Sequence, residues 1–197
     1  MLDTYGRKYV DPLINHVANF FLEKKKQPNE ITILALVVGL TTGPLIYLDH
    51  PILATVFLWI SGLLDAVDGA MARKIEKTSP WGTLMDITFD RMVEITVFLS
   101  LGLKYPKARM ELLILMVAIL LSMTIFLTVG ALSDQRGIKS FYYQAGLAER
   151  TEGFLLSSLM ILLSRYLRFF TLLYAGLVFF TAVQRMLEAK RILSHLE

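Results

Sequence analysis

The sequence predicts an all-α membrane protein with six transmembrane helices and an interfacial amphipathic helix at its N-terminus. Of the 197 residues, 55% are hydrophobic and only 19% are charged, whereas soluble domains average about 25% charged residues. Six stretches are apolar over roughly the 20 residues that a helix needs to cross a bilayer. The segment before them instead alternates apolar and polar residues at helical spacing.

The N-terminal segment has the pattern of a helix that lies on the membrane surface. Asp11 and Pro12 are typical of an N-cap followed by a first helical residue, so we expect the helix to begin there. Its apolar and polar residues fall on opposite faces, namely Val10, Leu13, Ile14, Val17 and Phe21 against Asn15, His16, Asn19 and Glu23. Three lysines end this helix, and the turn Gln27-Pro28-Asn29 leads into the first span.

The six expected spans cover residues 31–49, 52–71, 84–103, 111–132, 147–164 and 169–187. We find no internal repeat or low-complexity tract, so residues 1–197 are predicted to form one domain, with 1–27 as the interfacial helix and 28–197 as the bundle. Gly39 and Gly43 have the small-xxx-small spacing of closely packed helices. A kink at Pro44 or glycines that face lipid would explain them equally well.

Lysine and arginine residues set the expected orientation, because they are enriched in cytoplasmic segments. With six spans, fourteen of the 20 basic residues fall on the side of the two termini, and five fall on the other side: Lys104, Lys107, Arg109, Arg165 and Arg168. We therefore predict that both termini, and the loops on their side, face the cytoplasm.

Composition also excludes several kinds of site. The chain has no cysteine, which removes thiolate metal sites, disulfides and thiol catalysis. The net charge is +3, and no run of basic residues is long enough to indicate nucleic-acid binding.

Four aspartates gather near the cytoplasmic ends of the second and third spans. Asp65 and Asp68 share one helix face, and Asp86 and Asp90 share another. Because the loop between them is short, we expect the four carboxylates to converge. Such a group near a bilayer needs a strong cationic partner, and oxygen ligands favour one or two Mg²⁺ or Mn²⁺ ions, which often bind substrate phosphates. In the simpler alternative, the aspartates pair with nearby Arg and Lys residues and only fix helix packing.

The same segment resembles the CDP-alcohol phosphotransferase family. Its signature, D-x2-D-G-x2-A-R-x8-G-x3-D-x3-D, is matched at every fixed position: Asp65, Asp68, Gly69, Ala72, Arg73, Gly82, Asp86 and Asp90. The six-helix plan, the amphipathic N-terminal helix and the Pro28-Asn29-x-x-Thr32 segment extend the resemblance over most of the chain.

The resemblance implies an integral membrane enzyme, with a homodimeric assembly, that joins a CDP-linked lipid to a small polar alcohol and releases CMP. Asp65, Asp68 and Asp86 would ligate two metal ions, and Asp90 would ligate one ion and act as the general base. The CDP-lipid site would be formed by Asn29, Thr32, Asp68, Gly69, Ala72, Arg73, Ser79 and Gly82.

The acceptor alcohol is less legible. Arg136, Lys139 and Arg150 lie on the predicted cytoplasmic side, where they would form a basic pocket for a phosphorylated polyol. The D-x3-D-R form of the signature and the sequence Glu149-Arg150-x-Glu152 look more like the branch that uses inositol phosphate, and glycerol 3-phosphate stays open. The alternatives are topology-setting charges together with a neutral or zwitterionic acceptor such as inositol, serine or choline.

Two rival functions use similar residues. Intramembrane prenyltransferases also bind diphosphates through Mg²⁺ and aspartates, but usually from two well-separated helices, whereas these four aspartates lie within one short segment. A divalent-cation or proton-coupled transporter would tend to repeat its acidic sites in inverted halves, and we find no such repeat.

Overall fold

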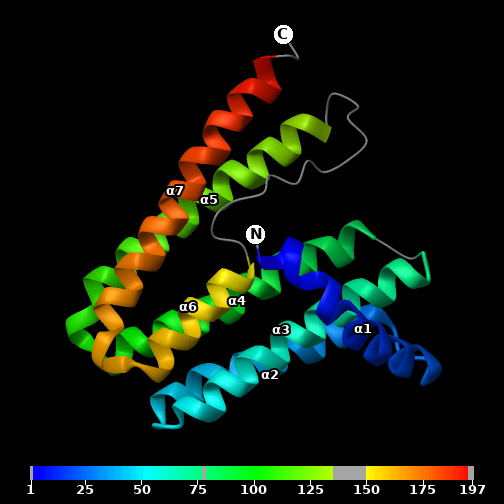
Figure 1. Cartoon of the computed structure of the whole chain (residues 1–197), viewed down its shortest axis with the longest axis horizontal. Helices are drawn as coiled ribbons and strands as arrows, with labels where there is room; N and C mark the ends of the chain where they lie inside the picture. The colour runs from blue at the N-terminus through cyan, green and yellow to red at the C-terminus, as the bar shows by residue number, and fades with distance from the viewer. Residues whose placement is uncertain (1, 77–78, 135–149, 195–197) are drawn as a thin grey trace. The chain divides into compact units, whose positions relative to one another are not determined.

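The computed structural model describes residues 2–76, 79–134 and 150–194, which are helical almost throughout (Figure 1). The seven α-helices within them are α1 (Leu2–Glu23), α2 (Pro28–Tyr47), α3 (Pro51–Lys74), α4 (Pro80–Lys104), α5 (Arg109–Asp134), α6 (Arg150–Leu162) and α7 (Leu167–Ser194). Short 3-10 turns, Pro106–Ala108 and Ser164–Tyr166, precede α5 and α7. The all-helical class is as predicted.

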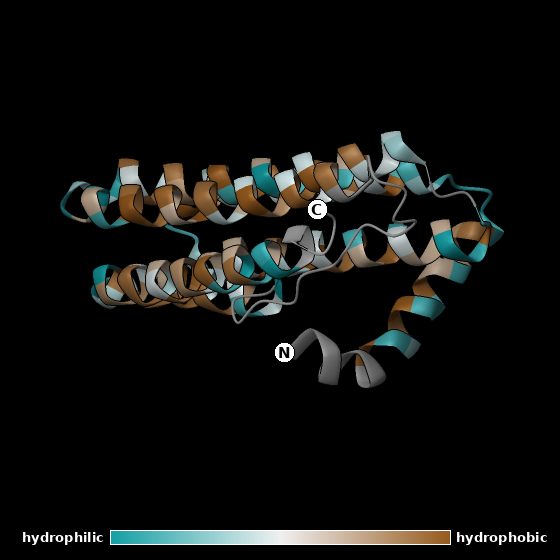
Figure 2. Cartoon of the chain, turned by 90° about the horizontal axis from the view of Figure 1, so that it is seen from above, coloured by the Kyte–Doolittle hydropathy of each residue, from teal (hydrophilic) through white to brown (hydrophobic). Residues whose placement is uncertain are grey.

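The helices fall into two compact units. The N-terminal unit is Tyr5–Pro106, and the C-terminal unit is Lys107–Glu197 with Met1–Thr4. In the N-terminal unit α2 packs against both α3 and α4, and in the C-terminal unit α7 packs against both α5 and α6. Hydrophobic residues run along the helices of each unit, as Figure 2 shows.

Four segments are long and apolar enough to cross a membrane, so the predicted count of six is not confirmed. They are Pro28–Tyr47, Pro51–Lys74, Pro106–Leu132 and Ser164–Arg191. The third predicted span is a helix of 25 residues, α4, but it carries the charges of Asp86, Asp90, Arg91 and Glu94. The fifth corresponds to α6, of which 13 residues are described; its first predicted residues, 147–149, lie outside the described part.

The N-terminal helix differs from the prediction at its start. α1 begins at Leu2 and continues through Pro12, which lies inside the helix. A proline removes one backbone donor and displaces the carbonyl group four residues earlier, and here that loss does not end the helix. An Asp-Pro pair therefore gave the wrong starting residue.

The buried face of α1 packs onto α2 and α3. Its Ala18 is fully buried in a cluster with Ile31 of α2 and with three residues of α3, Val67, Ala70 and Met71. Beside this cluster the Lys74 ammonium group donates to the Asn15 carbonyl oxygen at 3.2 Å and to Asn19 Oδ1 at 2.5 Å. α1 is thus attached to the α3 segment that carries Asp65 and Asp68.

Gly39 and Gly43 face neighbouring helices rather than lipid, and both are buried. A Cβ atom at Gly39 would lie 2.6 Å from Ser61 Oγ of α3, and one at Gly43 would lie 2.7 Å from Ser100 Oγ of α4. Both distances are too short for real contacts. The small-xxx-small interpretation is therefore confirmed, and α2 continues through Pro44 as a helix.

α4 accompanies α2 over the full length of α2. Gly82 lies near Asn29 at one end, and Val93 lies against Gly39 midway. At the other end the Lys104 ammonium group donates to the Ile46 carbonyl oxygen and forms a 2.7 Å ion pair with Asp49. The two helices therefore run in the same direction.

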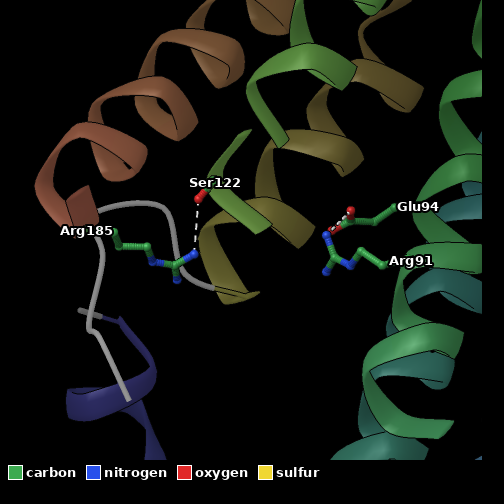
Figure 3. Close-up of polar contacts among 4 residues, drawn as sticks. All are labelled: Arg91, Glu94, Ser122 and Arg185. Atoms are coloured by element: carbon green, nitrogen blue, oxygen red, sulfur yellow. Dashed lines mark hydrogen bonds and ion pairs between the residues drawn. The ribbon is translucent and has the colours of Figure 1, made fainter. Parts of the chain in front are cut away.

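Polar contacts join α5 and α7 within the C-terminal unit. Arg185 Nη1 of α7 donates to Ser122 Oγ of α5 at 3.0 Å (Figure 3), and the Arg185 guanidinium lies 5.1 Å from the centre of the Phe126 ring. At the beginning of these helices Arg168 forms an ion pair with the buried Glu111. These contacts tie the two helices together near both ends of α7.

Candidate active site

Three of the four predicted carboxylates converge in the N-terminal unit. Asp65, Asp68 and Asp86 each present one carboxylate oxygen within 4.8 Å of the other two. Asp65 and Asp68 are 7% and 6% exposed, and Asp86 is half-buried. Such closely spaced acidic groups repel one another in their ionised form unless a cation lies between them.

Helix periodicity explains why these side chains meet. On α3, Asp65 and Asp68 are three residues apart and so share a face, while Val67, Ala70 and Met71 turn into the cluster with α1 and α2. On α4, the Ser79 hydroxyl oxygen accepts from the Gly82 amide at 3.0 Å and caps the helix. The cap starts α4 so that Asp86, one turn after Gly82, comes to the acidic face of α3.

The three carboxylates fit a hard divalent cation. Mg²⁺ holds oxygen ligands at about 2.0–2.1 Å, so opposite ligands lie about 4.2 Å apart. The observed spacing of at most 4.8 Å needs only a small movement of the side chains to reach that geometry. The donor set contains oxygen alone, which favours Mg²⁺ or Mn²⁺ over metals that prefer nitrogen or sulfur.

Asp90 lies one turn further along α4 and is not part of the three-carboxylate group. It precedes Arg91, whose guanidinium group pairs with Glu94, as Figure 3 shows. This pair commits Arg91 to a carboxylate on its own helix. Asp90 therefore differs in surroundings from the other three aspartates, which is compatible with a different chemical role.

Gly69 and Arg73 form a cationic edge beside the carboxylates. A Cβ atom at Gly69 would lie 3.3 Å from Arg73 Nη1, so the guanidinium group folds back over the glycine backbone, next to Asp68. Ala72, half-buried, precedes Arg73 on the same helix. Without a side chain at residue 69, an anionic group can approach both the backbone and the guanidinium group.

Asn29, Ser79 and Gly82 meet at the beginning of α2 and α4. A Cβ atom at Gly82 would lie 3.2 Å from Ser79 Oγ and 3.6 Å from Asn29 Oδ1, so the glycine leaves a small polar cleft between the two helix ends. A hydroxyl group that accepts the cap hydrogen bond can still donate its own hydrogen. Thr32 differs from this group because it is buried and donates to the Pro28 carbonyl oxygen at 3.1 Å.

Of the predicted acceptor residues the structure describes only Arg150, since Arg136 and Lys139 lie outside the described residues. Arg150 begins α6, and its guanidinium carbon lies 5.8 Å from the centre of the Phe154 ring. This contact was not foreseen, although the spacing of four residues on a predicted helix is a signal that could have indicated it.

Comparison with protein families places most of the chain in one of them. A family model described as CDP-alcohol phosphatidyltransferase matches residues 25–184. The match includes all four aspartates and begins just before α2.

Two similar proteins illustrate the range of relatives. An uncharacterized protein of Aquifex aeolicus is 32% identical over 192 residues, which is 95% of this chain and 94% of that protein. An archaetidylinositol phosphate synthase of Pyrococcus horikoshii is 36% identical over 76 residues, 39% of this chain and 40% of that enzyme.

The fold is similar to that of a solved enzyme. The phosphatidylinositol phosphate synthase of Mycobacterium tuberculosis with CDP-DAG bound has a TM-score of 0.72 and 21% identity, and the comparison covers 90% of this chain and 94% of that one. Its complex with manganese and citrate has a TM-score of 0.70 at 21% identity and covers 89% of this chain and 88% of that one.

Proposed function

Because the chain belongs to the CDP-alcohol phosphatidyltransferase family, we propose that it transfers the lipid phosphate group of a CDP-linked lipid to a phosphorylated polyol and releases CMP. Within the family, inositol phosphate and glycerol 3-phosphate are the two acceptors that the sequence favours. The family assignment makes the chain a multi-pass membrane enzyme of phospholipid synthesis. The acceptor and the residue roles below are our proposal.

The observation that carries the proposal is the group of Asp65, Asp68 and Asp86. It lies in one unit with the cationic edge of Gly69 and Arg73 and with the polar cleft of Asn29, Ser79 and Gly82. A diphosphate and a nucleoside need a divalent cation, an arginine and polar groups that reach the backbone. All these elements come from α2, α3 and α4.

In this proposal Asp65, Asp68 and Asp86 hold two Mg²⁺ or Mn²⁺ ions, with Asp90 as a further ligand. When bound, the ions would neutralise the diphosphate and the leaving CMP. Arg73 binds a phosphate oxygen of the CDP group, and Asn29 and Ser79 orient the nucleoside, with Thr32, Ala72 and Gly82 shaping its site.

Asp90 acts on the acceptor. It takes the proton of the acceptor hydroxyl as the hydroxyl oxygen attacks the lipid-side phosphorus and the bond from that phosphorus to the CMP oxygen breaks. The Arg91–Glu94 pair keeps a neighbouring guanidinium group engaged elsewhere, so that Asp90 can serve as the base.

A phosphorylated acceptor is supported by two observations. Several relatives are named as synthases of inositol phosphate lipids, and Arg150 places a guanidinium group at the beginning of α6. Arg136 and Lys139 complete the basic pocket in our proposal. A phosphate monoester is the acceptor group that such a pocket suits best.

We also propose that all six predicted segments cross the membrane, with the active site and both termini in the cytoplasm. The course of α4 supports this, because it follows α2 from Asn29 to Ile46 and so matches the depth of an accepted span. In the proposal residues 1–197 act as one domain, and two copies form a homodimer as the family resemblance implies.

The direct test uses purified protein with Mg²⁺, CDP-diacylglycerol and a panel of acceptors, scored by release of CMP. We expect inositol phosphate or glycerol 3-phosphate to support turnover, and inositol, serine and choline to be poor acceptors. Turnover with a neutral or zwitterionic acceptor alone would contradict the phosphorylated-polyol proposal and leave the family chemistry intact.

A single variant tests the pocket. Arg150→Ala should raise the acceptor KM by roughly ten- to a thousandfold, because a charge-assisted hydrogen bond contributes roughly 1.5–3 kcal/mol, and more where water is excluded. The KM for CDP-diacylglycerol should barely move. Arg165→Ala, which removes an exposed arginine just after the other end of α6, is the matched control.

A further inference from the structure

The inference concerns how the first turn of α6 is held, and it rests on the proposed role of Arg150 in acceptor binding. Arg150 lies over the ring of Phe154, one turn later on α6. Gly153 lies between them in sequence and is buried against α7. The three residues occupy little more than one helical turn, so a shift of α6 at Gly153 would move Arg150 as well.

Gly153 forms a notch that receives the side chain of Tyr174 from α7. Tyr174 is only 4% exposed. A Cβ atom at Gly153 would lie 2.6 Å from the Tyr174 hydroxyl oxygen and 3.5 Å from its ring carbon Cζ. The first distance is far below van der Waals contact and the second is an ordinary contact, so it is the hydroxyl group alone that requires glycine here.

Gly176 provides a contrast within the same unit. It also lies inside a helix, α7, but a Cβ atom there would meet nothing within 4 Å. Glycine is unfavourable in helix interiors compared with alanine. At Gly176 no neighbour in the described structure accounts for it, whereas at Gly153 the Tyr174 hydroxyl group does.

We propose that Gly153 and Tyr174 are positioning residues for acceptor binding. The hydroxyl group of Tyr174, held in the Gly153 notch, sets the separation of α6 and α7 and thereby the place at which the first turn of α6 presents Arg150. Phe154 then orients the guanidinium group of Arg150 through its ring face. None of the three residues touches the CDP-lipid site, which is built from helices of the N-terminal unit.

The first test is Gly153→Ala, measured as separate KM values for the two substrates in the purified enzyme. We expect the acceptor KM to rise by about ten- to a hundredfold, since a displacement of about 1 Å has effects of that order on positioned groups. The KM for CDP-diacylglycerol should stay within about twofold. Gly176→Ala is the matched control, and it should leave both KM values unchanged.

The second test is rescue by a complementary change. In Gly153→Ala/Tyr174→Phe the hydroxyl group is gone, and the new methyl group would meet the ring at 3.5 Å. The acceptor KM of the double variant should return to within about threefold of Tyr174→Phe alone, which sets the baseline of the double-mutant cycle. Failure of rescue in a folded double variant would overturn the notch.

A third variant decides the matter if Gly153→Ala does not fold. Phe154→Leu keeps the notch and removes the ring below Arg150, and it should raise the acceptor KM by about two- to thirtyfold with the CDP-diacylglycerol KM unchanged. Equal changes in both KM values would indicate general damage and contradict a positioning role.

The outcomes separate this inference from the proposed function. If Arg150→Ala raises the acceptor KM and neither Gly153→Ala nor Phe154→Leu does, the positioning role is wrong and the acceptor pocket stands. If Arg150→Ala has no effect either, the pocket itself is wrong, and the positioning role falls with it.

Discussion

Each of Asp65, Asp68 and Asp86 offers one oxygen to the same small volume, so each should be indispensable. Asp65→Asn, Asp68→Asn and Asp86→Asn should lower turnover by about a thousandfold or more, because each removes charge stabilisation of at least a few kcal/mol from the transition state. Asp11→Asn, an exposed change on α1, is the matched control. Binding of Mn²⁺, followed by its EPR signal, should weaken in the same three variants. Near-full activity in two of them at saturating Mg²⁺ would show that the metal assignment is wrong.

Asp90 should behave differently from its three neighbours. Asp90→Asn should lower kcat more than it weakens binding of CDP-diacylglycerol, because a general base acts on the acceptor hydroxyl group in the transition state. The measurement is steady-state kinetics combined with a direct binding assay for the donor lipid. A variant that only binds the donor more weakly would identify Asp90 as a metal ligand alone.

Residue-scale prediction from sequence succeeded where one motif contains the whole site. Asp65, Asp68 and Asp86 could be paired because helical periodicity fixes a shared face and a short loop fixes the two helices. The contact of Gly153 with Tyr174 could not, because it depends on how two helices approach each other and leaves no spacing rule in the sequence. Whether Asp90 serves as base stays a prediction.

At the scale of elements, the close packing of α2 against α3 and α4 gives a stability prediction. Gly39→Ala should lower the thermal midpoint of the purified protein, since a methyl group at Gly39 overlaps Ser61 and Val93, and overpacking costs about 1–3 kcal/mol. Gly176→Ala should hold or raise the midpoint, because it gains helix propensity without a clash. An equal midpoint for the two variants would contradict the tight contact.

The helices themselves were predicted within a few residues, because long apolar runs bounded by Pro28, Pro51 and Pro80 leave little choice of start. The start of α1 was wrong because a proline inside a helix and one at its first turn have the same local sequence. The attachment of α1 through Lys74 was also missed. A lysine near the end of a span has the same pattern whether it faces water or the polar side of a neighbouring helix.

For the whole molecule, the number of crossings can be decided with single cysteines, since the natural chain has none. With six crossings Lys107→Cys lies outside the cell, and with only the four apolar segments it lies inside. In cells treated with a membrane-impermeant maleimide we expect Lys107→Cys to be labelled. Arg165→Cys should be labelled and Lys25→Cys protected in either topology, so they serve as controls. A protected Lys107→Cys would show that α4 does not cross.

The division of the chain at Pro106 has a consequence for how acceptor preference can change. All the residues proposed to handle the CDP-lipid precede that point, and those proposed to receive the acceptor follow it. A crossover between two genes of the family near codon 106 would therefore exchange acceptor preference in one event while inheriting the donor chemistry whole. The ribosome likewise completes the donor-handling segment before it begins the remainder, so the first unit is available to start folding while the second is still being translated.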